Sequence, residues 1–183
     1  MTPLAAKKAT STIPIVMTNS VDPVGAGLVA SLAQPGGNVT GNSGLSPELI
    51  TKMLEILKDA VPKLTRVGHL RSGGGSVTEL QMKELRPAAV ALKLKLEEIE
   101  TQPDFKSLES AFKTAKQKQV GAIMVNPGRS FAAERKRIVD LASKHRLPAI
   151  YFSKEYVDEG GLMSYGVDFD DLFRRAAVYV DKI

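Results

Sequence analysis

Cysteine is absent from this chain of 183 residues, and histidine occurs only twice. Without cysteine, the chain can form neither a disulfide bond nor a thiolate metal site. The two histidines, His69 and His145, lie far apart in the sequence, and neither has a second ligand-type residue at metal-binding spacing. The sequence therefore predicts no metal ion and no other cofactor.

Long apolar runs are also missing. The longest, such as AAVYV at residues 176–180, are far shorter than the roughly 20 residues of a membrane-spanning helix. The first residues, Met1 to Leu4, contain neither the charged segment nor the apolar core of a signal peptide, so we predict no signal peptide within this chain.

Nucleic-acid binding is not expected either. The net charge is +5, but only 5% of the residues are aromatic. The lysines and arginines are scattered, mostly over expected helix faces, and no basic stripe with interleaved aromatic residues accompanies them. We interpret these charges as a solvated surface.

The positive features begin with a pattern that occurs three times. An apolar run of β type ends in a short polar loop that opens a helical pattern, at residues 13–27, 65–77 and 121–131. Alternation of strands and helices predicts an α/β fold, with a Rossmann-like three-layer arrangement in which helices cover both faces of a parallel sheet. In such sheets, the loops that leave the carboxyl ends of the strands line the ligand crevice.

Periodicity and turn signals place the expected elements. The expected strands are 13–17, 38–45, 66–70, 94–99 (an outer strand), 122–125, 148–152 and 162–165. The expected helices are 22–32, 46–61, 76–92 (with Pro87 in its middle), 105–118, 129–145 and 168–183, with a short helical turn at 156–158. In the helix over 105–118, Phe105, Leu108 and Phe112 are expected to share one face.

Three long segments together resemble one protein family. They are IPIVMTNSVDPVGAGLVASLAQPGGNVTG (13–41), SPELITKMLEILKDAVPKLTRVGHL (46–70) and the stretch from Arg146 to Ile183, which contains GGLMSYG. In this order they resemble the substrate-binding proteins of ABC transporters of the tryptophan/tyrosine-like class, which have a type I periplasmic-binding-protein fold. The resemblance implies two Rossmann-like lobes that clamp a small ligand, a periplasmic or other extracytoplasmic location, and docking on ABC permease subunits.

The resemblance also implies a domain arrangement. Residues 1–44 correspond to part of the N-terminal lobe, residues 45–165 to a complete C-terminal Rossmann-like lobe, and residues 166–183 to a crossover helix that returns toward the N-terminal lobe. Family members have further chain at both ends, so we expect this sequence to be a fragment. Apolar surface left bare in this way would favour a homodimer.

The first candidate loop carries Thr18, Asn19, Ser20 and Asp22. Hydroxyl groups and free backbone N–H groups at a helix N-terminus can hold a ligand carboxylate, and Asp22 can pair with an ammonium group. For Asp22 alone, the favoured alternative is a helix N-cap, which contributes about 1 kcal/mol.

The second and third loops carry Arg71 with Ser72, and Asn126 with Arg129. The glycines after Ser72 let a backbone approach a ligand, although a simple flexible turn is the favoured reading. Asn126 can donate to, or accept from, an amino-acid head group, and Arg129 can form a bidentate pair with a carboxylate. The alternative, an Asn-Pro-Gly turn beside a solvated arginine, stays open.

Three more candidates come from the region that matches the hinge of the family. Glu155 can meet a ligand ammonium group or pair with a basic residue. Tyr165 can stack on an aromatic ligand or pack within a hinge, and Asp168 is best explained as the cap of the last helix.

These loops offer N–H groups, hydroxyls, an amide, carboxylates and arginines, but no nucleophile paired with a base. The sequence therefore predicts a binding protein, not an enzyme, for a small solute such as an amino acid or related carboxylate. The family resemblance implies that this solute enters through an ABC import system. The alternatives are a truncated half-domain that binds nothing, and an enzyme or sensor on the same fold.

Overall fold

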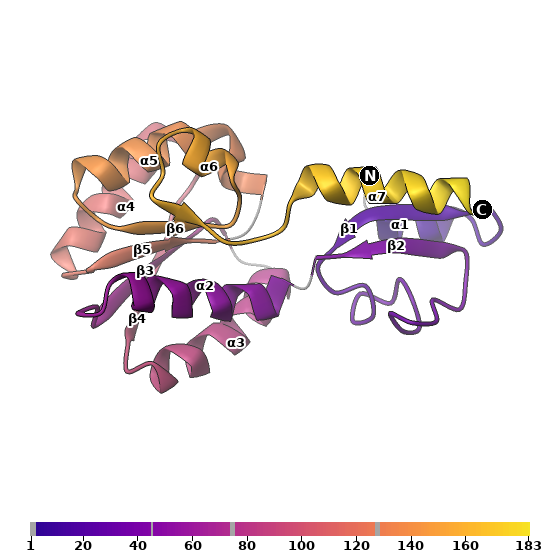
Figure 1. Ribbon diagram of the computed structural model, residues 1–183, viewed down its shortest axis with the longest axis horizontal. Coiled ribbons are helices and arrows are strands. Elements are labelled where there is room, and N and C mark those ends of the chain that lie inside the picture. The colour runs from indigo at the N-terminus through magenta and orange to yellow at the C-terminus, as the bar shows by residue number, and fades with distance from the viewer. Residues whose placement is uncertain (1–2, 45, 74–75, 127–128) are drawn as a thin grey trace. The chain divides into compact units, whose positions relative to one another are not determined.

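The structure is a computed structural model that describes residues 3–44, 46–73, 76–126 and 129–183, without the side chains of 46–47, 76–77 and 129. It divides into two compact units. The smaller unit comprises Met1–Ser46 and Val167–Ile183, and the larger unit is Pro47–Gly166 (Figure 1).

A parallel sheet forms the centre of the larger unit. Within the described residues it has five strands: β3 (Arg66–Arg71), β4 (Lys95–Glu100), β5 (Ala122–Val125), β6 (Ala149–Tyr151) and β7 (Met163–Ser164). Their spatial order is β4-β3-β5-β6-β7, and every pair is parallel. All residues of β5 and β6 are buried, as expected for inner strands covered on both faces. This confirms the predicted α/β fold, with β4 as the outer strand.

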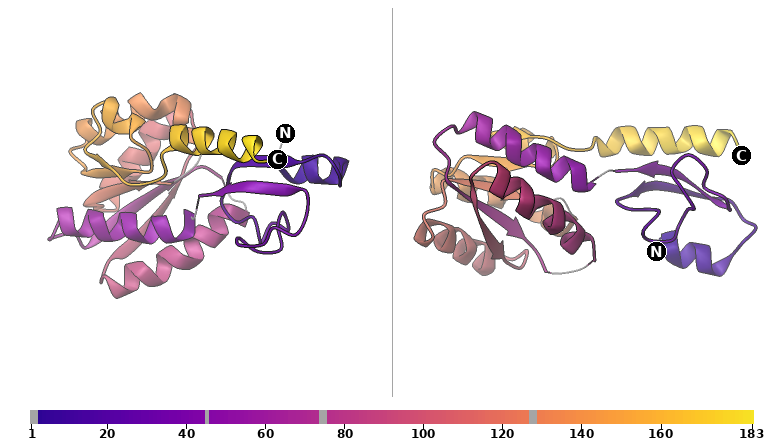
Figure 2. Two further views of the ribbon diagram at one scale, coloured as in Figure 1. Left: turned by 45° about the vertical axis from the view of Figure 1, so that its right-hand side comes forward. Right: turned by 90° about the horizontal axis from the view of Figure 1, so that it is seen from below.

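Helices cover the sheet on both sides. They are α2 (Ser46–Ala60), α3 (Ser76–Ala91), α4 (Phe105–Gln117), the 3₁₀ helix η1 (Arg129–Glu134), α5 (Arg135–Lys144) and the single turn α6 (Glu155–Asp158). The views in Figures 1 and 2 place α2 and α4 on opposite sides of the sheet. Helix α2 shows why these segments pack: Ile50, Met53, Leu54 and Leu57 recur at helical spacing and are completely buried.

The smaller unit has a much thinner core. Its two parallel strands, β1 (Ile15–Ser20) and β2 (Val39–Ser43), contact α7 (Phe169–Asp181), and α1 (Pro3–Ala9) contacts β1. Asn42 Nδ2 donates to the carbonyl of Leu172 at 3.1 Å and so ties β2 to α7. The buried apolar cluster consists of Met17, Leu28, Val29 and Val39, with Ile15 partly buried against it. A two-stranded sheet with so small a core is only marginally stable.

The expected helix over residues 22–32 is wrong. This segment forms hydrogen-bonded turns, because Gly27 has a φ of +66° and turns the chain out of helical geometry. The N–H groups of Leu28 and Val29 return to the carbonyl of Pro23 instead of continuing a helical ladder. Asp22 therefore caps no helix; its Oδ1 accepts from the N–H of Gly25 at 2.8 Å, within a turn.

One further expectation needs correction, because the segment expected as one helix over 129–145 is split into η1 and α5.

The three residues expected on one face of α4 differ in burial. Phe105 is 56% exposed, whereas Leu108 and Phe112 are buried. Phe105 is the first residue of α4, and the guanidinium of Arg137 lies 4.4 Å from the centre of its ring. A cation–π contact replaces burial at this position.

Candidate functional site

The order of the strands selects one position in the larger unit. The chain passes from β3 to β4 on one side and later reaches β5 on the other side of β3. The loops that leave β3 and β5 therefore diverge at their carboxyl ends, which is the topological switch point where open α/β sheets bind ligands. Arg71 ends β3, Ser72 follows it, and Asn126 follows β5.

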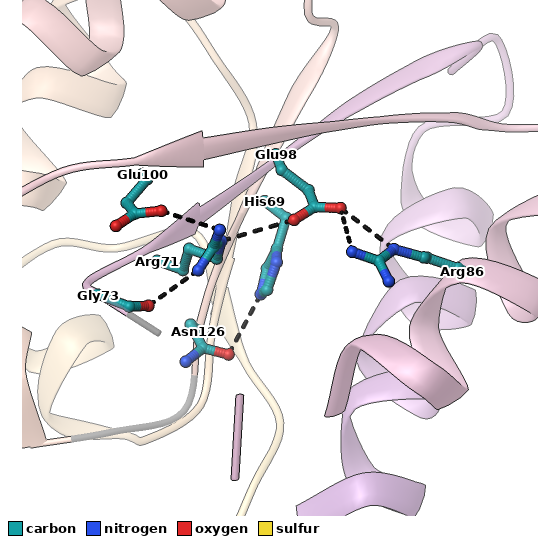
Figure 3. Close-up of polar contacts among 7 residues, drawn as sticks. All are labelled: His69, Arg71, Gly73, Arg86, Glu98, Glu100 and Asn126. Atoms are coloured by element: carbon teal, nitrogen blue, oxygen red, sulfur yellow. Dashed lines mark hydrogen bonds and ion pairs between the residues drawn. The ribbon is translucent and has the colours of Figure 1, made fainter. Parts of the chain in front are cut away.

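A buried polar pair occupies this position. His69 Nε2 and Asn126 Oδ1 lie 3.2 Å apart (Figure 3). His69 is completely buried and Asn126 is 8% exposed. The strand register places His69 beside Met124, and the backbone N–H of Asn126 donates to the carbonyl of Leu70 at 2.8 Å, which extends the pairing of β3 and β5 by one residue. The side chain of Asn126 thus lies on the same face as that of His69.

Burial lowers the pKa of His69 to about 4. The hydrogen bond with Asn126 and the charge of Glu98 act in the opposite direction but are weaker, and Arg71 adds to the lowering. At neutral pH the imidazole is therefore uncharged and carries a single ring proton. A neutral ring can position Asn126 without placing a charge in the sheet.

Arg71 lies in an ion-pair network next to this pair. Its Nη2 lies 2.9 Å from a carboxylate oxygen of Glu100, its Nε lies 3.6 Å from Glu98, and its Nη1 donates to the carbonyl of Gly73 at 2.8 Å (Figure 3). Arg86 of α3 contacts the other oxygen of Glu98 at 2.9 Å. The network follows from the register, because Glu98 and Glu100 lie opposite His69 and Arg71. Arg71 is therefore held by carboxylates of its own sheet.

The other candidates of the larger unit lie around the next strands. Glu155 begins α6, Ser72 is half-buried, and Tyr165 follows β7 with 38% of its surface exposed. The backbone of Arg129 begins η1, but its side chain lies outside the described residues, as do Gly74 and Gly75. These placements leave the roles of the four candidates as predictions.

The candidates of the smaller unit lie at the end of β1 and at α7. Thr18, Asn19 and Ser20 are the last residues of β1, not a loop after it, and no helix begins at Asp22. The predicted anion site at a helix N-terminus is therefore wrong. Asn19 Oδ1 is buried with no hydrogen-bond partner in the described chain. Asp168 caps α7 as expected, since its Oδ1 accepts from the N–H of Asp171 at 3.0 Å.

Sequence reasoning missed His69 as a site residue. It assigned His69 to a strand and considered it only as a metal ligand. The available signal was one histidine within a run that is otherwise apolar at its centre, RVGHLR. In a strand buried on both faces, a polar side chain needs a hydrogen-bond partner, and that requirement points to a polar residue on a neighbouring strand.

A hollow of about 400 Å³ lies elsewhere in the larger unit. It lies at the outer edge of the sheet, between the end of β4 and α4, and hydroxyl groups of Thr101, Ser107 and Thr114 are among its lining. It includes none of the candidate residues. Its position beside the last strand, away from the switch point, makes it the weaker ligand site.

The described residues include no group of three or more histidine, aspartate or glutamate side chains arranged to hold a metal ion. None of the helices described combines the length and the apolar character needed to cross a membrane.

Comparison with known proteins now adds to the geometry. Residues 2–183 match the family described as ABC transporter substrate binding protein. The chain belongs to that family. The resemblance seen in the sequence is thus confirmed. A curated relative, the tyrosine-binding protein of Clostridioides difficile (strain R20291), is 33% identical over 175 residues.

Solved structures agree with this assignment. A conserved domain protein from Vibrio cholerae O1 biovar El Tor is 30% identical with a TM-score of 0.83. The ABC domain from Streptococcus pneumoniae, solved in complex with L-Trp, is 26% identical with a TM-score of 0.81. In both cases 98% of this chain is covered, together with 60% of the other chain.

The match to the curated relative also covers nearly all of this chain but only part of the other protein. It covers 94% of this chain and 49% of the relative. The chain thus spans about half the length of the curated relative it matches.

Proposed function

We propose that this chain is the solute-binding component of an ABC import system and that it binds an amino acid or a related carboxylate. Membership of the substrate-binding family supports the class of function. The observation that carries the choice of ligand is that one relative is named a tyrosine-binding protein and another was solved in complex with L-Trp.

The site proposed for this ligand is the carboxyl-end edge of the five-stranded sheet. Asn126 and Ser72 supply polar groups at the switch point, next to the buried His69. The remaining candidates of the larger unit, Arg71, Arg129, Glu155 and Tyr165, come from the same sheet edge. The candidates of the smaller unit, Thr18, Asn19, Ser20, Asp22 and Asp168, stay predictions as ligand contacts.

Membership of the family also leads us to propose partners and a location. We expect docking on ABC permease subunits and a periplasmic or other extracytoplasmic location. The larger unit is proposed as a complete lobe, and the smaller unit as part of the second lobe. The exposed apolar residues of α7, among them Phe173, Val178 and Val180, are the surface through which a homodimer would form.

Calorimetric titration of the full chain with L-tyrosine and with L-tryptophan tests the proposal. We expect a saturable heat with a stoichiometry of one ligand per chain, because the proposed site at the switch point holds a single ligand. D-Glucose and AMP serve as controls that should give no heat. Absence of binding by both amino acids, or turnover of either one, would contradict the proposal.

Size-exclusion chromatography with light scattering tests the homodimer separately. A dimer that dissociates when Val178 and Val180 are both replaced by Ser is expected, because that change removes apolar surface from the exposed side of α7. A wild-type chain that elutes as a monomer at every concentration contradicts this part of the proposal.

A further inference from the structure

The fold gathers basic residues at one edge of the five-stranded sheet. Four loops lead from helices α2 to α5 into the amino ends of β3, β4, β5 and β6, and because these strands are parallel, the loops lie at the edge opposite the switch point. Figure 1 shows them at the left end of the larger unit. The turn before β7, where Glu159 pairs with Arg135 at 3.2 Å, is not part of this surface. We call the surface the amino-end edge and define it by residues 58–66, 92–97, 116–121 and 144–148.

The amino-end edge concentrates the positive charge of the chain. It holds nine of the 25 lysines and arginines but only two of the 20 acidic residues, Asp59 and Glu97. The rest of the chain, with the remaining 16 basic and 18 acidic residues, is slightly negative. Charges that look scattered in the sequence are thus brought together by the fold. The basic residues of the edge are Lys58, Lys63, Arg66, Lys93, Lys95, Lys116, Lys118, Lys144 and Arg146.

Only part of this charge is compensated within the unit. Lys95 and Lys118 pair with Glu97 at 2.8 and 3.2 Å, and Lys144 pairs with Glu109 at 3.1 Å. The edge nevertheless presents uncompensated cations to solvent. Four exposed cations have no ion-pair partner among the residues that the structure describes, namely Lys63, Lys93, Lys116 and Arg146.

Two of these four cations occupy backbone positions that favour glycine. The N–H of Lys93 donates to the carbonyl of Val90 at the end of α3, and the same bond recurs for Gln119 and Arg146 at the ends of α4 and α5. This is the Schellman motif, whose left-handed residue is usually glycine. Here the left-handed residues are Lys93, Gln119 and Arg146, with φ of +55°, +55° and +53°, and they are the only non-glycine residues with positive φ in the described chain.

The helix dipole explains only some of the cations. Lysines in the last turn, such as Lys116 and Lys144, interact favourably with the C-terminal end of a helix and need no partner. At the left-handed position, however, a side chain strains the backbone and glycine would relieve the strain. Strain of this kind clusters where the side chain has a function. The side chains of Lys93 and Arg146 thus indicate a role outside the fold.

The arrangement of the cations selects the kind of partner. The four loops lead into the neighbouring strands β4, β3, β5 and β6, which are spaced by about 4.8 Å, so the cations form a row and do not converge on one point. The four segments of the edge contain no Phe, Tyr or Trp on which a nucleic-acid base could stack. A row of cations matches a surface that offers negative charge at every lateral position, as anionic lipid headgroups do.

We propose that the amino-end edge is a docking surface for a membrane of anionic phospholipids, and that Lys93 and Arg146 contribute side chains to it at the expense of the stability of the fold. Docking through this edge leaves the switch point, at the opposite edge of the sheet, clear of the lipid. The inference goes beyond the proposed function and does not depend on which solute the chain binds.

Sedimentation of the full chain with lipid vesicles tests the docking surface. Vesicles of phosphatidylglycerol and phosphatidylcholine in equal parts should bind the chain at low salt and release most of it at high salt, whereas vesicles of phosphatidylcholine alone should not bind it. Equal binding to both kinds of vesicle, or binding that salt does not weaken, would overturn the inference. Tighter binding to duplex DNA or to poly-L-glutamate than to the anionic vesicles, at the same salt concentration, would overturn the assignment to lipid.

Glycine substitutions separate docking from folding. Lys93→Gly and Arg146→Gly should each weaken binding to the anionic vesicles by about fivefold, the effect of one basic residue at an anionic surface. The midpoint of urea denaturation should stay the same or rise, because glycine relieves the left-handed backbone. Gln119→Gly is the matched control: it relieves the same strain without removing a charge, so it should bind as the wild type does.

Lys106→Ala controls for net charge. Lys106 is exposed in the first turn of α4, at the other edge of the sheet, so its loss removes one charge but should leave vesicle binding unchanged. Unchanged binding by the Lys93 and Arg146 variants, or an equal loss in Lys106→Ala, would overturn the docking surface. Glycine variants that unfold at lower urea concentrations than the wild type would show that the two side chains serve the fold and would overturn their assigned role.

Discussion

Protonation of His69 should make the stability of the larger unit depend on pH. The side chain has a pKa of about 4 in the folded chain, against an ordinary value near 6.5. Below about pH 6.5 the histidine of the unfolded chain binds a proton, whereas the buried histidine of the folded chain stays neutral down to about pH 4. The contribution of His69 to the free energy of unfolding is therefore fully present above about pH 6.5 and is lost as the pH falls toward 4. The perturbation that isolates this effect is His69→Gln, which removes the titrating group.

The magnitude follows from these two pKa values. Binding of the proton by the unfolded chain alone costs about 0.2 kcal/mol of stability at pH 7 and about 2 kcal/mol at pH 5. The wild-type chain should therefore lose about 1.8 kcal/mol more than His69→Gln between these two pH values. The partners of carboxylates such as Glu97 and Glu109 lower the pKa values of these groups. The stability that these carboxylates contribute is lost mainly below about pH 5, and it is the same in the wild type and in His69→Gln.

Urea denaturation at pH 7, 6 and 5, followed by far-UV circular dichroism, measures the difference. His145→Gln is the control for the second histidine, whose pKa is also lowered, chiefly by burial and then by Lys144. It should retain the extra pH dependence of the wild type. Parallel loss of stability in the wild type and in His69→Gln would refute the reasoning, because His69 would then titrate equally in both states.

Three further predictions concern packing, capping and backbone geometry. Leu57→Ala should destabilise the larger unit by about 2–5 kcal/mol in urea denaturation, because Leu57 is completely buried. Val90→Ala is the control, and it should change stability by less than about 0.5 kcal/mol because Val90 is 75% exposed. Equal effects of the two substitutions would contradict the packing. Asp104→Ala should cost about 1 kcal/mol because it removes the acceptor for the N–H of Ser107 at the start of α4, and Asp104→Asn should recover most of that loss; an Asn variant no better than Ala would count against capping. Gly41→Ala should separate β1 from β2, because Gly41 has a φ of +134° and an added Cβ would lie 2.0 Å from the carbonyl oxygen of Met17. Hydrogen exchange of the backbone amides of β1 should therefore become faster. Exchange as slow as in the wild type would contradict the close approach of β1 and β2 at Gly41.

The sequence predicted the larger unit well because its signals are local. Asp104 before the helix α4, the apolar spacing of α2 and the buried run of β5 each determine their own element. Their alternation then predicts a parallel sheet by the rules of chain crossover. Such elements need no knowledge of distant contacts.

The smaller unit shows where local signals fail. Asp22 and Pro23 are good residues for a helix start, yet Gly25 and Gly27 follow within one turn. Gly25 lies so close to Asp22 that an added Cβ would lie 2.0 Å from its carboxylate. The turn is stabilised by that approach and by the positive φ of Gly27, and both are properties of the folded chain.

The candidate site was only partly accessible to sequence reasoning. Asn126 was found because it follows a strand, but its partner His69 lies 57 residues earlier in the chain. Only the register of β3 against β5 brings the two together. Arg71 was a candidate ligand residue in a loop for which a flexible turn was the favoured interpretation, and its ion pairs with Glu98 and Glu100 of β4 depend on strand pairing that a single strand does not reveal.

A titration followed by NMR tests the central claim most directly. In the full chain labelled with ¹⁵N, we expect addition of L-tyrosine or L-tryptophan to shift the side-chain amide signals of Asn126 and the backbone amide signal of Ser72. These chemical-shift changes should be the largest in the larger unit. Shifts confined to the hollow beside Thr101 and Ser107, or no shifts at all, would contradict the account of a carboxylate ligand held at the switch point of the sheet.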